Sequence, residues 1–231
     1  PLGHRDILNL ANQKVVGFFS IKPDSQRFNK KNFANLGGKP LYAWATELLE
    51  DIPWLSARYI LCNSQLELNL SPSISRIEKP TDLENDNVGS NEIIRYFSGI
   101  VDADWYLYIH ATSPFISEGT ITTLFQEVLE GKFHSGLTVT RAQTFAYYDG
   151  VPVNFNPQQL QRTQDLKPVY LENSGAYIFD RPLAKKGLRV AKNPLFHEVG
   201  WPETIDIDHI SDYQEAILAL PAVPARKQSR R

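Results

Sequence analysis

The stretch that most constrains the fold runs from Val15 to Tyr42, with the sequence VVGFFSIKPDSQRFNKKNFANLGGKPLY. It opens with an apolar run and then changes abruptly to a polar segment that contains four cations, Lys22, Arg27, Lys30 and Lys31. A Gly-Gly-Lys-Pro sequence closes this segment before apolar residues resume at helical spacing. The pattern predicts a strand, an anion-binding loop and a helix, in that order.

The rest of the chain alternates predicted strands and helices. Pro40 is expected to begin a helix that ends near Asp51, and a short β-rich run, Arg58–Cys62, follows it. A strand, a helix and a strand in succession build a parallel sheet whose ligands bind at the carboxyl ends of its strands. Further along we expect a loop over 71–89, helices over 90–100, after the N-cap Ser117 and over 211–220, and strands over 105–109, 135–140, 175–179 and 205–208.

The domain organisation is expected to be simple, with one domain over residues 13–220. An Asp149-Gly150 pair between apolar residues predicts an antiparallel hairpin, so residues 142–172 are expected to form a hairpin insertion. Residues 1–6 are set aside as a cloning remnant with a disordered start, and residues 221–231 as a flexible tail.

Charge and composition limit the partners. The net charge of -2 argues against a general nucleic-acid or membrane-surface binder, so the local basic cluster indicates a small anion. The single cysteine, Cys62, excludes an intrachain disulfide and fits a reducing compartment. Because no apolar stretch approaches the ~20 residues that span a bilayer, and no leader is recognised, a cytoplasmic protein is expected.

Two carboxylates stand two residues apart near the end of the chain, Asp206 and Asp208. On a strand they would share one face and could hold a hard cation such as Mg²⁺. The alternative is a solvated strand end in which Asp208 caps the next helix, and the spacing by itself favours that alternative. The basic loop shifts the balance, because it would supply the other half of a nucleoside triphosphate site.

The cations of the first loop have two interpretations. They could pair with phosphate oxygens, and Arg27 fits best because its guanidinium forms two hydrogen bonds at once. Lys30 and Lys31 could instead be a solvated loop face, as most short charge runs are. Two residues after the 105–109 strand also have two interpretations each. Thr112 could orient a base or ribose, or it could belong to an ordinary turn. His110 could face a ligand, but an isolated histidine is more often structural than catalytic.

Five blocks in collinear order resemble the acylneuraminate cytidylyltransferases, the CMP-sialic acid synthetases and their relatives. They read SIKPDSQRFNKKNFANLGGKPLYAW, KPTDLENDNVGSNEII, YIHATSPF, the pair RTQD and NSGAYIF, and IDIDHISDYQEA. The resemblance implies an α/β, three-layer Rossmann-like nucleotidyltransferase fold with a GT-A-like mixed sheet and a small antiparallel hairpin insertion. It also implies a homodimer in which the insertion of one subunit reaches toward the other. Such enzymes use CTP and Mg²⁺ to form a CMP conjugate of an acidic sugar and release pyrophosphate.

The resemblance also assigns roles to individual residues. Catalysis is assigned to Lys22, Arg27, Asp206 and Asp208, with the two aspartates as metal ligands. Nucleotide binding is assigned to Ser25, Lys31, Asn32, Lys79 and Ser90. The acceptor is assigned to His110, Thr112, Arg162, Gln164, Tyr170 and Asn173.

The chain departs from the family pattern where it matters for the substrate. The first loop of the family reads Arg-x-Gly-Ser-Lys-Arg, whereas here Lys22, Asp24 and Gln26 replace its first arginine, its glycine and its lysine. His110 stands in place of a sugar-facing glutamine. We therefore leave the acceptor open between a sialic-acid-like sugar and a small phosphonate.

Two other functions remain as alternatives. A glycosyltransferase would use Asp206-Ile207-Asp208 as an Asp-x-Asp metal site, although in that class the motif normally lies mid-chain. A degenerate relative would bind nucleotide without turnover, as the altered first loop suggests.

Overall fold

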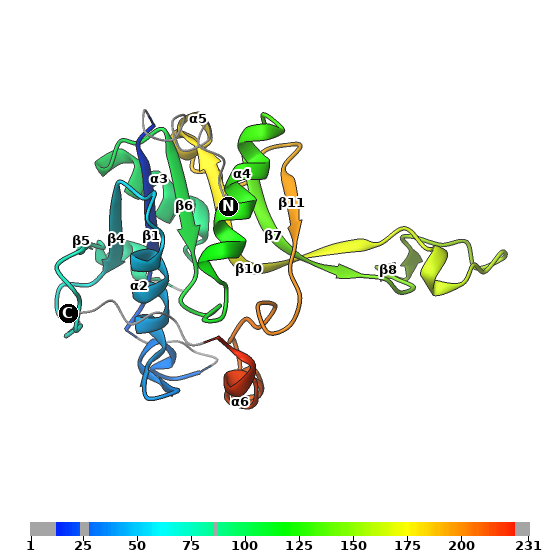
Figure 1. Ribbon diagram of the computed structural model, residues 1–231, viewed down its shortest axis with the longest axis horizontal. Coiled ribbons are helices and arrows are strands. Elements are labelled where there is room, and N and C mark those ends of the chain that lie inside the picture. Colours follow the sequence, from blue (N-terminus) through cyan, green and yellow to red (C-terminus); the bar gives the residue numbers. More distant parts are fainter. Residues whose placement is uncertain (1–12, 24–27, 86, 225–231) are drawn as a thin grey trace.

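A seven-stranded mixed sheet forms the centre of the molecule (Figure 1). The computed structural model describes residues 13–23, 28–85 and 87–224. The strand order across the sheet is β11-β7-β10-β6-β1-β4-β5, and all pairs are parallel except those of β10 with β6 and β7. The strands are β1 (Val15–Ser20), β4 (Ala57–Cys62), β5 (Ile74–Glu78), β6 (Trp105–Ile109), β7 (Ser135–Ala142), β10 (Val169–Asp180) and β11 (Leu195–Glu198).

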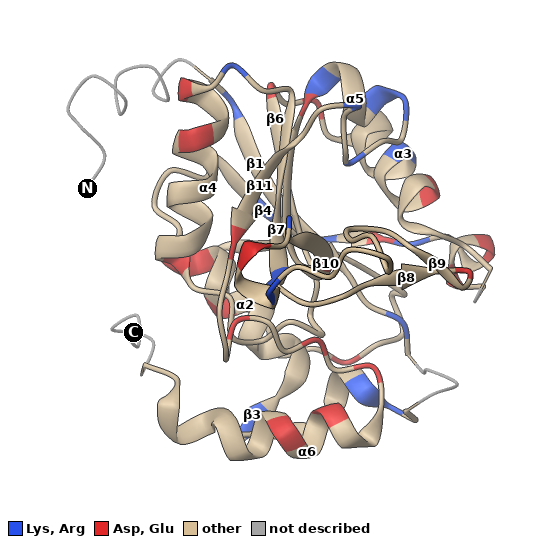
Figure 2. Ribbon diagram, turned by 90° about the vertical axis from the view of Figure 1, so that its right-hand side faces the viewer, with Lys and Arg blue, Asp and Glu red and all other residues tan. Residues whose placement is uncertain are grey.

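Helices cover both faces of the sheet, which gives the predicted three layers (Figure 2). On one face, α2 (Leu41–Asp51) and α4 (Glu118–Glu130) pack on the side that contains Val15 and Phe19 of β1. On the other face, α3 (Ser90–Ile100) and α5 (Arg181–Lys185) pack on the side that contains Val16 and Phe18. Successive strand residues point to opposite faces, so the wholly apolar run of β1 follows from burial on both sides.

A third apolar cluster lies below the carboxyl ends of the strands. It joins α6 (Ile210–Ala219) to α2 and includes Ile205 and Ile207. A 3₁₀ turn, Leu220–Ala222, continues α6, and Val223 packs against the same cluster. The remaining short elements are 3₁₀ turns at Lys31–Phe33, Thr81–Glu84 and Thr163–Asp165, and the strand pairs β2 (Asn35–Leu36) with β3 (Lys39–Pro40) and β8 (Tyr147–Tyr148) with β9 (Val151–Pro152).

The structure differs from the expected elements at four points. The predicted loop over 71–89 contains β5, and the sequence analysis did not foresee β11; both are the outer strands of the sheet. The strand predicted over 205–208 is wrong, because those residues form no strand and do not belong to the sheet. The first helix begins at Leu41, and Pro40 is its N-cap.

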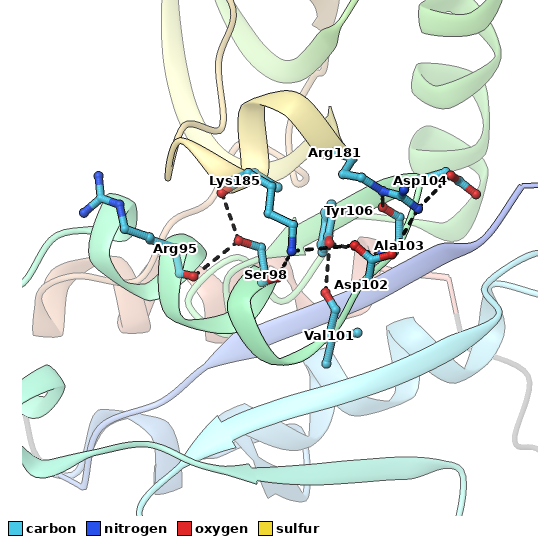
Figure 3. A network of polar contacts seen from close by, with 10 residues as sticks. Arg95, Ser98, Val101, Asp102, Ala103, Asp104, Tyr106, Arg181 and Lys185 are labelled. Carbon is cyan, nitrogen blue, oxygen red and sulfur yellow. Dashed lines mark hydrogen bonds and ion pairs between the residues drawn. The ribbon is translucent and has the colours of Figure 1, made fainter.

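A polar network holds the end of the sheet opposite α6 (Figure 3). Arg181 at the start of α5 donates to the backbone oxygen of Ala103 over 2.8 Å and pairs with Asp104 over 3.0 Å. Lys185 donates to the backbone oxygen of Ser98 at the end of α3 over 2.5 Å. The network therefore fixes α5 against α3 and the beginning of β6.

An arm, residues 143–168 between β7 and β10, projects from the sheet (Figure 1). Its β8–β9 hairpin turns at Asp149 and Gly150, both with positive φ (49° and 76°), as the Asp-Gly signal predicts. Asn154 closes the arm on itself, because its side-chain amide donates to the backbone oxygens of Thr144 and Lys167.

No helix among the described residues is long and apolar enough to cross a membrane.

Candidate functional site

Polar side chains gather at the edge of the sheet where the parallel strands end. The first loop follows β1 there, and His110 and Thr112 follow β6. Since β10 runs antiparallel and its Ala176 pairs with Ile109, the residues just before Ala176 extend past the end of β6 at the same edge. Ligands of α/β proteins bind at such an edge.

The first loop is joined to the C-terminal segment by an ion pair. Lys31 is buried, and its Nζ lies 2.9 Å from Oδ1 of Asp208. The neighbouring Asn32 donates from its side-chain amide to the backbone oxygen of Lys22 over 2.9 Å. The Lys22 ammonium donates to the backbone oxygen of Asn85. These contacts connect four of the predicted site residues in two pairs, Lys31 with Asp208 and Asn32 with Lys22.

Asp206 lies in the same segment, which a hydrogen bond from the Ile207 N–H to the backbone oxygen of Thr112 (2.8 Å) holds at the end of β6. Burial raises the pKa of the Asp206 carboxyl, the charge of Asp208 raises it further, and the Thr112 hydroxyl and the Lys31 charge oppose the shift. Its Oδ1 is buried and has no hydrogen-bond partner among the described residues. An unsatisfied buried carboxylate oxygen is costly, so a ligand or cation at this point would stabilise it.

The donor set fits Mg²⁺ as the resemblance implies. Mg²⁺ is usually held by one or two carboxylates together with substrate phosphates and water, rather than by an all-protein cage. Asp206 and Asp208 supply two carboxylates, and Oδ1 of Asp206 is an unused acceptor. No group of three or more His, Cys, Asp or Glu side chains that could hold a metal occurs among the described residues.

His110 is an uncharged hydrogen-bonding group in this site. Burial, together with the nearby positive charge of Arg189, lowers the pKa of the His110 imidazole to about 3. Its ring contacts the rings of Tyr108 and Tyr177, with centroids 4.8 and 5.8 Å away. In the described part of the chain its Nε2 has no hydrogen-bond partner. His110 can therefore donate or accept one hydrogen bond but does not act as a cation near neutral pH.

Arg189 is the main site residue that the sequence analysis missed. Its guanidinium lies 4.0 Å above the centre of the Tyr177 ring, donates to the Ser90 hydroxyl over 3.1 Å and pairs with Glu172 over 3.2 Å. The Tyr177 hydroxyl also donates to Glu172, over 2.8 Å. Ser90, predicted to read the nucleotide, thus begins α3 within this network. Arg189 stands in a loop after α5 without a motif, so no local pattern could have identified it.

A β-bulge in β10 presents Asn173 to the site. The pairing of β10 with β7 shifts register between Glu172 and Tyr177, and Ser174 has a positive φ of 57°. Asn173 is 7% exposed, and its Oδ1 accepts from the Thr138 hydroxyl over 2.7 Å and from the Gly175 N–H over 3.2 Å. Its Nδ2 has no partner among the residues described. The amide nitrogen thus has unused donor capacity among the described residues.

Lys79 has a structural position. It is 1% exposed, and its ammonium donates to the backbone oxygen of Ile21 over 2.6 Å and lies 3.4 Å from Oε1 of Glu84. Burial lowers the pKa of Lys79, and the charge of Glu84 opposes this shift. Lys79 therefore ties the end of β5 to the start of the first loop.

The other predicted residues are not part of this group. Arg162 and Gln164 lie on the arm, where Arg162 pairs with Asp165. Tyr170 lies at the base of the arm, and its hydroxyl donates to Glu198 over 2.9 Å. Ser25 and Arg27 fall outside the described residues. Their assignments remain predictions.

A hollow of about 410 Å³ opens beside Asp206, between the base of the arm and α6. Its lining consists of Thr140, Leu171, Glu172, Asn173, Thr204, Ile205, Asp206, Asp212 and Glu215. This acidic hollow shares Asp206 and Asn173 with the site described above.

A family model described as Cytidylyltransferase matches residues 23–199, most of the chain and nearly all of the sheet. The chain belongs to the cytidylyltransferase family. It is accordingly a nucleotidyltransferase, as the collinear blocks predict. The narrower resemblance to CMP-sialic acid synthetases stays a prediction. No curated protein matches the chain.

Solved structures of similar fold agree with the family. A CMP:2-keto-3-deoxy-manno-octonic acid synthetase complexed with CTP is 13% identical, with a TM-score of 0.65 over 90% of this chain and 99% of the other. The 4-diphosphocytidyl-2C-methyl-D-erythritol synthase of Anaerococcus prevotii is 12% identical, with a TM-score of 0.64 over 92% and 98%. The bifunctional IspDF of Campylobacter jejuni is 16% identical, with a TM-score of 0.62 over 87% and 54%. These similarities confirm the predicted fold class.

Proposed function

We propose that this cytidylyltransferase transfers a CMP group from CTP to an acidic acceptor and releases pyrophosphate. Family membership supports cytidylyl transfer, and one structure of similar fold is a synthetase in complex with CTP. The observation that carries the proposal is the Lys31–Asp208 pair beside Asp206, at the edge where the first loop meets the ends of the strands. A cation and two carboxylates at such an edge suit a triphosphate with its counterion.

The reaction requires little covalent chemistry from the protein. An acceptor oxygen forms a bond to the α-phosphorus of CTP, the bond from that phosphorus to the bridging oxygen breaks, and pyrophosphate leaves with the electron pair. Positioning and charge neutralisation dominate such transfers. An anionic phosphonate acceptor has no proton to lose, whereas a hydroxyl acceptor must give one up.

Each part of the site has a proposed role. Lys22, Arg27 and Lys31 bind the β- and γ-phosphates, and Ser25, Asn32 and Ser90 help to bind the nucleotide. Asp206 and Asp208 would hold Mg²⁺, which when bound neutralises charge on the phosphates. His110, Thr112 and Asn173 face the acceptor, whereas Lys79 acts by holding the first loop.

We further propose that the enzyme is a homodimer in which the arm of one subunit completes the site of its partner. The arm exposes large apolar side chains, including Tyr147 (63%), Tyr148 (80%) and Leu160 (68%). Exposed apolar surface of this kind often marks a protein–protein contact. Such an arrangement would bring Arg162, Gln164 and Tyr170 to the acceptor, as their assigned roles require.

The test is a screen for pyrophosphate release with Mg²⁺, in which the four nucleoside triphosphates are crossed with nonulosonic sugars and small phosphonates. We expect release with CTP and one acceptor class. Release with another triphosphate in preference to CTP would contradict the nucleotide assignment. CTP binding without release on any acceptor would favour a nucleotide-binding relative that has lost turnover.

A further inference from the structure

The negative charge of the acidic hollow opposes the binding of an acceptor that carries only negative charge. Its lining includes four carboxylates, from Glu172, Asp206, Asp212 and Glu215, and no lysine or arginine among the described residues. Figure 2 shows the acidic positions on α6, the helix that contributes Asp212 and Glu215. An anion placed against this wall would be repelled by every charged group that lines it.

Two of the four carboxylates are already engaged. Glu172 pairs with Arg189, and Asp212 accepts the backbone N–H groups of Asp208 and His209 over 2.9 and 2.7 Å. Glu215 and one oxygen of Asp206, Oδ1, remain, and the volume of about 410 Å³ is that of a small-molecule pocket rather than of a single ion. The hollow thus has room and charge for a cationic organic group.

A second observation, independent of the charge, indicates a ligand at the same place. Asn173 lines the hollow and is 7% exposed, yet its Nδ2 has no partner in the described structure. Its orientation is fixed, because Oδ1 already accepts two hydrogen bonds. Oδ1 of Asp206 is likewise unpartnered among the described residues. Oδ1 of Asp206 needs a donor or cation, which the proposed Mg²⁺ would supply, whereas Nδ2 of Asn173 needs an acceptor, which a ligand in the hollow would supply.

We propose that the acidic hollow binds a protonated amine of the acceptor, so that the acceptor is a zwitterion with its acidic group toward the transferred phosphate. This inference rests on the proposed cytidylyl transfer to an acidic acceptor and specifies its substrate class. The ammonium lies against Glu215, and an acidic oxygen of the same molecule accepts from Nδ2 of Asn173, while Asp206 keeps its carboxylate for Mg²⁺. The amine offsets the repulsion that the carboxylates would otherwise exert on the acceptor.

Binding tests the inference without turnover. Isothermal titration would compare ω-aminoalkylphosphonates of two to four carbons with ω-hydroxyalkylphosphonates of the same lengths, with and without Mg²⁺. We expect the best amine to bind at least tenfold more tightly than its hydroxyl counterpart in both conditions. Equal affinity within twofold, no binding of either series, or a preference that disappears when Mg²⁺ is added would overturn the proposal.

A variant that removes one negative charge from the acidic hollow tests where the amine binds. Glu215→Gln removes one charge from the hollow and is expected to reduce the amine-over-hydroxyl preference about three- to tenfold. Glu130→Gln, at the exposed end of α4 away from the hollow, makes the same change in charge and is expected to leave the preference unchanged. An unchanged preference in Glu215→Gln would place the amine elsewhere.

Turnover separates this inference from the proposed function. Pyrophosphate release with CTP that is as fast for hydroxyl as for amine acceptors would reject the zwitterion while leaving cytidylyl transfer intact. Absence of CTP-dependent release with every acceptor, despite tight amine binding, would reject the proposed function and leave the amine site standing.

Discussion

Asp208 contributes to the candidate site through its charge. Its carboxylate pairs with the buried Lys31 ammonium and stands two residues from Asp206. Asp208→Asn keeps a hydrogen-bond acceptor for Lys31 but removes the charge that would hold the proposed Mg²⁺. We therefore expect pyrophosphate release to fall at least a hundredfold. Because the buried Lys31 ammonium also loses its counter-charge, we expect the thermal unfolding midpoint to fall while the chain still folds.

Asp208→Glu serves as the matched control, since it keeps the charge but moves it by one methylene. Partial activity in that variant would agree with a metal ligand. Near-normal turnover in Asp208→Asn would exclude the charge of Asp208 from catalysis.

The buried, neutral imidazole of His110 is expected to make the free energy of unfolding depend on pH. Because the folded pKa is about 3 and the ordinary value is 6.5, the unfolded chain binds a proton between these values that the folded chain does not. Stability is thus lost as pH falls from 6.5 toward 3, by at most about 1.4 kcal/mol per pH unit. We expect His110→Gln to flatten this slope in urea unfolding measured between pH 7 and 4.5.

Tyr108→Phe is the control, because it alters a ring that packs against His110, with centroids 4.8 Å apart, and removes no group that titrates between pH 4.5 and 7. We expect it to keep the wild-type slope. If His110→Gln also keeps that slope, the imidazole is not buried in its neutral form.

At the residue scale, the sequence analysis named five residues that the structure places at the same edge of the sheet: Lys31, His110, Asn173, Asp206 and Asp208. Strand ends indicated only part of this set, since Lys31 lies in the loop after β1 and His110 follows β6, whereas Asn173 lies at a bulge within β10 and was named from the family resemblance. Arg189 reaches the site only because the loop after α5 folds back over Tyr177, and such a contact leaves no periodicity. Sequence alone also cannot show that Lys79 is buried and bonded to the backbone.

At the scale of elements, the outer strands are the ones that were missed. β5 reads ISRIE and is mostly exposed, and β11 has only four residues. An edge strand pairs on one side and is short or polar, so the usual signals of apolar alternation are weak. Of the central strands, which are buried on both faces, β6 was predicted with its observed bounds, 105–109, and β1 was predicted to begin at Val15.

The segment over 205–208 shows the opposite error. Ile205 and Ile207 are buried while their neighbours are less so, which is the alternation of a strand. The apolar side chains instead pack on α6 and Trp44, and one hydrogen bond to Thr112 replaces a ladder. The alternation of buried and exposed residues shows that one side of a segment is buried. It does not show whether a neighbouring strand or a helix packs against that side.

The contacts of Lys79, which connect the end of β5 to the first loop, can be tested by mutation. Lys79→Met removes the bond to the Ile21 carbonyl and leaves Glu84, whose side chain is 13% exposed, without its cation. Breaking a buried pair in this way costs about 3 kcal/mol. We expect a fall of this size in the free energy of unfolding, measured with urea, and weaker CTP binding.

The double variant Lys79→Met with Glu84→Leu removes both charges and is expected to recover part of the stability but not the CTP affinity. Full recovery of CTP affinity would show that Lys79 does not position the first loop.

At the scale of the whole molecule, the arm predicts the oligomeric state. Tyr148 on the arm and Leu218 on α6 are almost equally exposed, at 80% and 79%. If the arm forms the dimer, Tyr148→Ser is expected to shift the mass measured by light scattering toward the monomer, whereas Leu218→Ser is not. A monomeric wild-type protein, or an effect of Leu218→Ser alone, would contradict the arm interface.

Complementation tests whether the arm acts in the partner's site. Arg162→Ala and Asp208→Ala would each be inactive, but a mixed dimer places both changes in one site and leaves the other intact. Random exchange of equal amounts then restores about a quarter of wild-type activity, in a symmetric dimer with independent sites. No recovery after confirmed subunit exchange would assign both residues to the same site.

The position of β10 has a consequence for the order in which the chain can fold during synthesis. β6, with its buried WYLYI sequence, pairs with β1 on one side and with β10 on the other, and β10 begins only at Val169. A nascent chain that has completed β6 must therefore keep an apolar strand edge unpaired until the whole arm has been translated. Such an edge is a template for aggregation. Truncation before Val169 would remove the strand that protects the middle of the sheet, even though every residue of the first loop would still be present.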